Sequence, residues 1–233
     1  MKLLALDTST EFLSLAVQTD HGLFTCHEAT GPAASQRILP EIERLLTEAV
    51  VALKDLDGIV YGMGPGAFTG VRVSVGVAQG LAFGAGLPVV GVSSLLAVAQ
   101  MAWQETQAEK IVVCLDARMG EVYHAAFIKQ AAGWLEVSAP VVCKPFEVPR
   151  LEGGDWLAAG SGWAVFADVL AAQYPAQVTR IYADMMPQAA AMLTLALPQF
   201  ASGQTQAAHE AAPLYVRNRV ALTAAERAQG QTL

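Results

Sequence analysis

The chain has 233 residues, which is enough for one large domain or two small ones. Hydrophobic residues make up 54% of it and charged residues 15%, so it can bury a large core and still present apolar surface to a partner. The net charge is −7 and the 14 lysines and arginines are scattered, which argues against strong nucleic-acid binding by this chain alone.

The first third of the chain is predicted to contain three strands and a helix. Residues 2–6 are a short apolar run typical of a buried strand, and we expect no signal peptide because this run reaches Asp7 at once. Residues 13–18 and 23–28 flank a hairpin signal and predict two paired strands. A helix with Ser35 as N-cap follows, because apolar residues recur at three- and four-residue spacing: Ile38, Leu39, Ile42, Leu45, Leu46, Ala49 and Leu53.

The next segment alternates strands and helices. The pattern predicts a strand at 59–61, a tight glycine loop, a helix over 69–83, a strand at 89–92 and a helix to about residue 105. Residues 73–104 carry no charge and could in length span a bilayer, but their glycines and Pro88 favour a buried core segment. Cys26, Cys114 and Cys143 are far apart in sequence, which is typical of reduced thiols in a cytoplasmic protein.

The second half begins like the first, with an apolar strand that ends in Asp116 as the first strand ends in Asp7. This order predicts a duplicated α/β fold with mixed sheets covered by helices. We expect a first subdomain at 1–106, a second at 107–219, and a flexible tail at 220–233. The second is predicted to hold strands at 111–116, 121–128, 134–142, 156–159 and 212–217, and helices at 163–173 and 188–201.

Two segments could bind an anion. The turn at 7–10 offers hydroxyls and backbone N–H groups, and Asp7 could hold a metal-bound water, although polar turns are common at strand ends. The glycine loop at 62–70 precedes a helix N-terminus, yet it lacks the lysine of a phosphate-binding loop, so a tight strand-to-helix connection explains it equally well. A further stripe of glycines at four-residue spacing (Gly76, Gly80, Gly84) predicts close approach of a backbone, which is more simply the protein's own sheet than a partner helix.

The residues give little support for a metal site or a serine nucleophile. The four histidines (His21, His27, His124, His209) show no metal-ligand spacing, and Gly160-Ser161-Gly162 does not complete a serine nucleophile motif. Arg118 and Glu121 are predicted to form an exposed ion pair across the second turn. We therefore expect no metal site and no catalytic residue in this chain.

Several motifs together resemble the bacterial TsaB (YeaZ) family, a non-catalytic homologue of TsaD. They are LALDTST at 4–10, GPGAFTGVR at 64–72, LPVVGVSSL at 87–95, LDARMGEVY at 115–123, GSGW at 160–163 and PLYVRN at 213–218. The resemblance covers residues 1 to about 219 and implies the actin-like ATPase (ASKHA) fold. It implies a role in threonylcarbamoyladenosine (t6A) formation at position 37 of ANN-decoding tRNAs, in the cytoplasm.

In that family the protein supports a catalytic subunit, TsaD, and a small ATPase, TsaE, joins them. The resemblance also implies a homodimer when the protein is alone, contact with tRNA only through the complex, and no cofactor except ATP or ADP at a site shared with partners. The catalytic homologue carries a His-x-x-x-His metal pair where this chain has Ser94 and Val98, which cannot hold the metal in the same way.

These considerations predict a scaffold or activator subunit with two functional regions. The partner interface is predicted on two helices, at Ile38, Leu39, Ile42, Leu45, Val73, Val77 and Leu81. A vestigial or shared nucleotide site is predicted at Asp7, Thr8, Ser9, Gly64, Gly66, Thr69 and Asp116. The alternative is an ATP-dependent kinase or ATPase that acts on its own with Asp7 and Asp116 around Mg²⁺. A peptidase is a third possibility, without a metal pair or nucleophile to support it.

Overall fold

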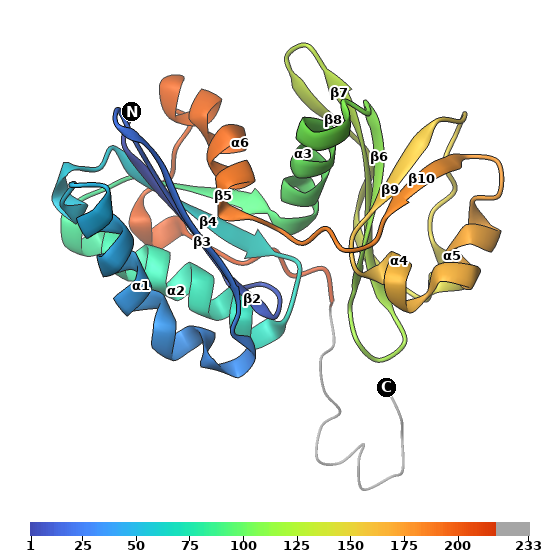
Figure 1. Ribbon diagram of the computed structural model, residues 1–233, viewed down its shortest axis with the longest axis horizontal. Helices are drawn as coiled ribbons and strands as arrows, with labels where there is room; N and C mark the ends of the chain where they lie inside the picture. The colour runs from blue at the N-terminus through green and yellow to red at the C-terminus, as the bar shows by residue number, and fades with distance from the viewer. Residues whose placement is uncertain (218–233) are drawn as a thin grey trace, which may run out of the picture.

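The computed structural model describes residues 1–217, which form two lobes that each contain a five-stranded sheet (Figure 1). The first sheet consists of β1 (Leu3–Asp7), β2 (Phe12–Thr19), β3 (Gly22–Ala29), β4 (Gly58–Gly64) and β5 (Val89–Ser93). The second consists of β6 (Lys110–Asp116), β7 (Val122–Gln130), β8 (Gly133–Cys143), β9 (Trp156–Ala159) and β10 (Val178–Tyr182).

The two sheets share one topology. Their strand orders are β3-β2-β1-β4-β5 and β8-β7-β6-β9-β10 when both are written in the same direction. In each, three antiparallel strands are followed by two strands that run parallel to the central one. The predicted α/β architecture of two duplicated subdomains, each with a mixed sheet flanked by helices, is confirmed.

Helices cover both faces of both sheets. They are α1 (Ala34–Glu48), α2 (Phe68–Ala85), α3 (Ser94–Thr106), α4 (Gly162–Val165), α5 (Ala167–Gln173) and α6 (Ala189–Ala201), with short 3-10 turns at Gly31–Ala33, Leu53–Asp55, Pro145–Glu147 and Ala208–Glu210. Helices α1 and α2 cover the outer face of the first sheet, and α4 and α5 lie beside the second (Figure 1). Helices α3 and α6 contact each other between the sheets.

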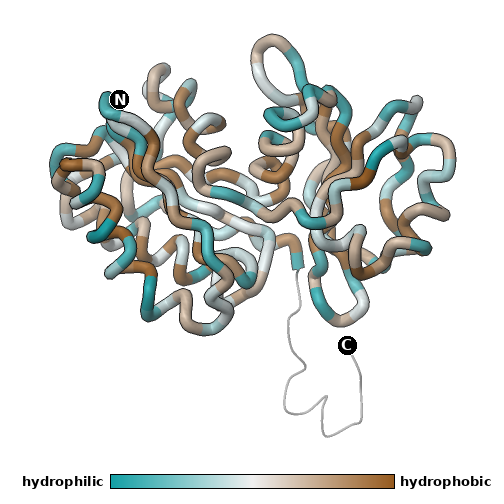
Figure 2. Tube along the Cα trace, in the orientation of Figure 1, coloured by the Kyte–Doolittle hydropathy of each residue, from teal (hydrophilic) through white to brown (hydrophobic). Residues whose placement is uncertain are grey.

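Each sheet is therefore packed on both faces, which explains the high apolar content. In the first lobe one core lies under α1 and α2 and another under α6; in the second, one lies under α3 and another beside α4 and α5. The most hydrophobic segments follow the central strands and the helix faces that meet them (Figure 2). Within residues 1–217 we find no helix with the length and apolar character needed to cross a membrane.

Several local predictions are wrong. Helix α1 begins after Ala33 rather than at a Ser35 cap, and it ends at Glu48, so Leu53 belongs to a separate turn. The predicted helix at 163–173 is two helices, because Phe166 adopts non-helical angles between them. Strand β10 was not predicted, and residues 212–217 form no strand.

The predicted subdomain boundaries also differ from the packing. Helix α6 lies within the range expected for the second subdomain, yet it packs on β1, β2, β4 and β5 of the first sheet. The reason is that the inner face of the first sheet is apolar and needs a cover that the first 106 residues do not supply. The predicted tail at 220–233 lies outside the described residues.

Candidate functional site

Asp7 ends β1 at the turn that leads into β2, and its carboxyl group is almost completely buried, with 1% of the residue exposed. One oxygen, Oδ2, accepts hydrogen bonds from the Ser9 backbone N–H at 3.2 Å and from the Ser9 hydroxyl at 2.8 Å. The other, Oδ1, has no hydrogen-bond partner and lies against Gly62, where a Cβ would overlap it. Burial raises the pKa of Asp7 to about 6, and the two bonds from Ser9 oppose this.

The glycine loop packs directly onto this turn. The Thr8 hydroxyl donates to the carbonyl of Gly70 at 2.6 Å, and the Ala67 N–H donates to the carbonyl of Ser9 at 2.7 Å. A Cβ on Gly70 would overlap the Thr8 carbonyl oxygen, and one on Gly66 would overlap that of Ser9. These glycines are therefore required for close contact between α2 and the first turn, which supports the structural interpretation of the loop.

A cleft of about 680 Å³ separates the lobes beside these segments. Five of the seven predicted nucleotide-site residues line it: Thr8, Ser9, Gly66, Thr69 and Asp116. Asp7 and Gly64 do not, because Asp7 is buried behind the turn and Gly64 lies at the end of β4 against Val71. The cleft is thus a joint surface of the two lobes, without the Asp7 carboxylate that an ATPase of the predicted kind would present to Mg²⁺.

The second turn closes the other side of the cleft. The Asp116 N–H donates to the Ser161 hydroxyl at 3.1 Å, and the Asp116 carboxylate pairs with Arg118 at 3.2 Å. The predicted pairing of Arg118 with Glu121 is wrong: Glu121 pairs with Arg217 at 2.8 Å. Arg217 comes from the end of the described chain, which local sequence patterns could not place here.

The positions that correspond to the metal pair of the catalytic homologue lie in α3. Ser94 and Val98 are both completely buried. The Ser94 hydroxyl donates to the Ser9 hydroxyl at 2.9 Å, and Ser9 donates to Asp7, so a short buried hydrogen-bonded chain links α3 to the first turn. Among residues 1–217 we find no group of three or more histidine, cysteine, aspartate or glutamate side chains that could hold a metal ion.

The predicted partner interface needs correction. Ile38, Ile42 and Leu45 are 0%, 3% and 0% exposed and belong to the core between α1, α2 and the first sheet, so they offer a partner almost no surface. Val73, Val77 and Leu81 are partly buried against the same core. Of the α1 residues named, Leu39 alone is exposed, at 52%.

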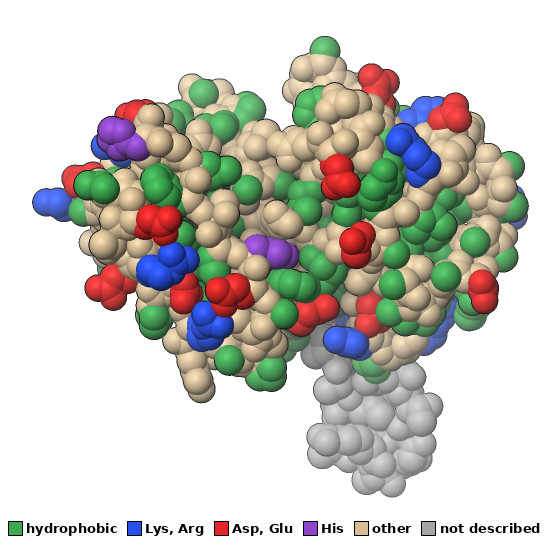
Figure 3. Space-filling view, in the orientation of Figure 1, with side chains coloured by type: hydrophobic (Ala, Val, Ile, Leu, Met, Phe, Trp, Pro, Cys, Tyr) green, Lys and Arg blue, Asp and Glu red, His purple; other side chains and the backbone are tan. Residues whose placement is uncertain are grey.

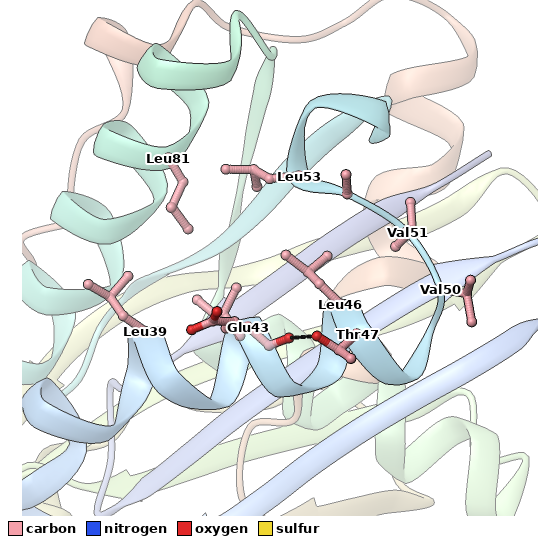
Figure 4. A pocket seen from close by; sticks show the side chains of 10 residues that line it. Leu39, Glu43, Leu46, Thr47, Val50, Val51, Leu53 and Leu81 are labelled. Atoms are coloured by element: carbon pink, nitrogen blue, oxygen red, sulfur yellow. Dashed lines mark hydrogen bonds between the residues drawn. The ribbon is translucent and has the colours of Figure 1, made fainter.

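An apolar groove runs between α1 and α2, next to the buried face. It has a volume of about 390 Å³ and is lined mainly by aliphatic side chains (Figure 4). Three of them, Leu39, Ile42 and Leu81, belong to the predicted interface. Glu43 and Thr47 are its polar members, and the Thr47 hydroxyl donates to the Glu43 carbonyl at 2.8 Å. The aliphatic members are Leu39, Ile42, Leu46, Val50, Val51, Ala52, Leu53 and Leu81. We call this surface the α1–α2 groove.

The glycine stripe of α2 continues this exposed surface. Gly76, Gly80 and Gly84 are exposed, and a Cβ added at any of them would meet no atom within 4 Å. The interpretation that the protein's own sheet requires these glycines is therefore wrong. Phe83 on the same helix is 80% exposed, so α2 presents both a smooth backbone surface and an aromatic side chain to solvent.

Charge on the molecule offers little to a polyanion. On the face in Figure 3, acidic and basic side chains are interspersed over both lobes without a continuous basic patch. One cationic cluster was missed by the sequence analysis: the Arg72 guanidinium lies 3.9 Å from the centre of the Phe68 ring and donates to the Tyr215 hydroxyl at 3.0 Å. Phe68 lies four residues before Arg72 on α2, whereas Tyr215 lies 143 positions after Arg72, so only the fold brings the second ring to the guanidinium.

Known proteins of similar sequence and structure identify the family. A family profile described as TsaD, tRNA N6-adenosine threonylcarbamoyltransferase, matches residues 28–225. The tRNA threonylcarbamoyladenosine biosynthesis protein TsaB of Escherichia coli is 40% identical over 95% of this chain and 96% of its own length. That of Haemophilus influenzae is 37% identical over 94% and 95%.

Two solved structures from Pseudomonas aeruginosa are similar over almost their entire length. YeaZ has a TM-score of 0.85 and 39% identity, with 92% of this chain and 99% of that chain covered. A protein described as similar to the peptidase YeaZ has a TM-score of 0.86 and 38% identity, with 93% and 99% covered. From this agreement of sequence, fold and motifs, the chain belongs to the TsaB (YeaZ) family of tRNA threonylcarbamoyladenosine biosynthesis proteins.

Proposed function

We propose that this chain is a non-catalytic scaffold or activator in the transfer of threonylcarbamoyl to adenosine 37 of ANN-decoding tRNAs. The main support is the position of Ser94 and Val98. Where the catalytic homologue carries its histidine pair, these side chains are buried in a packed core and contribute no metal ligand. Chemistry then belongs to a TsaD-like partner, and this chain acts by binding it.

The partner surface in this proposal is the α1–α2 groove with the exposed glycine stripe beside it. Leu39 and Leu81 supply apolar contact area, and Gly80 allows a partner helix to approach the α2 backbone closely. The same surface would account for a homodimer of the isolated chain. It replaces the buried residues of the original interface hypothesis.

Matched substitutions test this surface. Leu39→Glu and Gly80→Arg should each weaken binding of a TsaD-like subunit at least about tenfold, because they place charge or bulk in an apolar contact. Leu23→Glu is the control, since Leu23 is 53% exposed on β3 and does not line the groove. Binding that is equally strong in all three variants, measured by calorimetry, would reject the surface.

Nucleotide is proposed to bind only where a partner completes the site. Five predicted residues line the interlobe cleft, but Asp7 is buried and the Thr8 hydroxyl is already bonded to Gly70. ATP with Mg²⁺ should therefore bind the isolated chain weakly and bind the assembly with TsaD-like and TsaE-like subunits more tightly. Micromolar affinity of the isolated chain would instead favour the alternative of an independent ATPase.

The biological role, in the cytoplasm and with tRNA reached through the complex, is tested in the host. Depletion of this protein should lower the t6A content of bulk tRNA, as measured by mass spectrometry. Wild type should restore it, and Leu39→Glu should not, although Leu23→Glu should. Unchanged t6A after depletion would overturn the proposed function.

A further inference from the structure

Residues 211–217 cross from one lobe to the other as an extended segment, which we call the strap. On the first lobe the strap follows the end of β4. The Ala212 N–H donates to the Tyr61 hydroxyl at 3.1 Å, and the Leu214 N–H donates to the Met63 carbonyl at 2.7 Å. Tyr215 then packs beside Phe68 and accepts the hydrogen bond from Arg72.

The strap ends on the second lobe at Arg217. This side chain is only 12% exposed and makes three contacts with the turn between β6 and β7. Its guanidinium pairs with Glu121 at 2.8 Å, donates to the Ala117 carbonyl at 3.0 Å and lies 3.2 Å from the Met119 sulfur. Because the charge is paired and largely shielded from water, this contact is stronger than an exposed surface ion pair.

A second contact joins the lobes at the same place. The hydroxyl of Tyr123 on β7 donates to the carbonyl of Gly66 at 3.1 Å, across the rim of the cleft. Tyr123 is 8% exposed and lies with Tyr215 and Arg217 around one small cavity, so the two contacts form one continuous surface. Gly66 itself packs against Ser9 of the first turn. The Tyr123–Gly66 hydrogen bond therefore connects the second lobe to the residues that line the cleft.

We propose that the strap and Tyr123 form an interlobe latch that fixes the width of the cleft. Proteins that close two lobes around a ligand need an interface that can open. Here three segments cross between the lobes: α3, residues 183–188 and the strap. The strap is hydrogen-bonded to the first lobe at one end and to the second lobe at the other. The two lobes therefore move as one body, and the chain presents a rigid surface instead of opening and closing. This inference does not depend on the proposed function.

Distance measurements between the lobes test the latch. Spin labels are placed at Lys54→Cys on the first lobe and Arg180→Cys on the second, both exposed positions, in a Cys143→Ser background that leaves buried Cys26 and Cys114 unlabelled. Pulsed electron spin resonance on the full chain should give a single narrow distance distribution. Removal of both contacts by Tyr123→Phe with Arg217→Met should widen that distribution about twofold, because the cleft can then open.

Two further variants keep the test decisive. Arg150→Met removes an exposed arginine of the second lobe that has no ion pair among residues 1–217, and it should leave the distribution narrow. Tyr123→Phe alone removes one hydroxyl and keeps the fold, and it should give a smaller widening than the double variant. An unchanged distribution in Tyr123→Phe and in any folded Arg217 variant, or equal widening in Arg150→Met, would overturn the latch.

Discussion

Replacement of Asp7 by asparagine gives the most quantitative test of the buried first turn. Burial raises the pKa of Asp7 from 3.8 to about 6 in the folded protein. Between these values the folded state keeps a proton that the unfolded state loses, so stability falls as pH rises from 3.8 and levels off above 6. One pKa unit is about 1.4 kcal/mol, so the full cost is about 3 kcal/mol, most of which develops between pH 4 and pH 7.

Asparagine cannot ionise, so Asp7→Asn should become more stable relative to wild type by about 2 kcal/mol between pH 4 and pH 7. Its absolute gain is smaller, because an amide N–H₂ against Gly62 would lack a hydrogen-bond partner, as Oδ1 does now. Urea unfolding at several pH values measures the difference, and the comparison with wild type cancels other titrating groups. Ser9→Ala removes a bond that lowers the pKa of Asp7, so the fall in stability should extend to higher pH and become larger. A pH-independent difference between Asp7→Asn and wild type would refute the reasoning.

Three further predictions follow from burial. Leu45→Glu should unfold the chain because Leu45 is fully buried, whereas Leu39→Glu should melt within a few degrees of wild type. Thermal denaturation measures both, and the reverse order would contradict the assignment of core and surface. Burial lowers the pKa of His124 from 6.5 to about 4. The free energy of unfolding should therefore be highest above pH 6.5 and fall by about 3 kcal/mol as the pH drops to 4. In His124→Gln this acid-dependent loss should be absent. Gly70→Ala should destabilise the protein by about 1–3 kcal/mol, because the new methyl group overlaps Thr8. Gly76→Ala should stabilise it by about 0.5–1 kcal/mol, because the new methyl group meets no atom. Equal changes in the free energy of unfolding would contradict the close contact at Gly70.

Most of the fold could be predicted from local patterns because its central strands are short apolar runs followed by turn signals. β10 was missed because three of its five residues are exposed, so no buried run marks it. The duplication could have predicted this strand, because β10 occupies in the second sheet the position that β5 occupies in the first. The position of α6 on the first sheet depends on tertiary packing and has no local signature.

The partner interface was misjudged for a physical reason. Apolar periodicity along a helix marks the face that packs against its own domain, and Ile38, Ile42 and Leu45 follow that period into the core. Leu39 belongs to the same apolar pattern but is exposed, and the exposed Phe83 was not among the predicted interface residues.

The structure brings five of the seven residues of the nucleotide-site prediction to one cleft and leaves Asp7 and Gly64 outside it. Strand ends of a duplicated fold bring Ser9 and Asp116 to one cleft, and this follows from the order of elements. Whether a carboxylate faces that cleft depends on a neighbour 55 residues away, Gly62, which has no side chain to keep Asp7 out of the interior. The strap is similarly invisible, because its contacts join the end of the described chain to residues about 100 to 150 positions earlier.

The central claim is that this chain activates a partner without performing the transfer itself. The direct measurement is the rate of threonylcarbamoyl transfer to unmodified tRNA in a purified system with threonylcarbamoyl-AMP, a TsaD-like subunit, a TsaE-like subunit and ATP. The account predicts no transfer by this chain alone, little by the other subunits without it, and full transfer when wild type is added but not when Leu39→Glu is added. Transfer by this chain in the absence of the TsaD-like subunit would contradict the account.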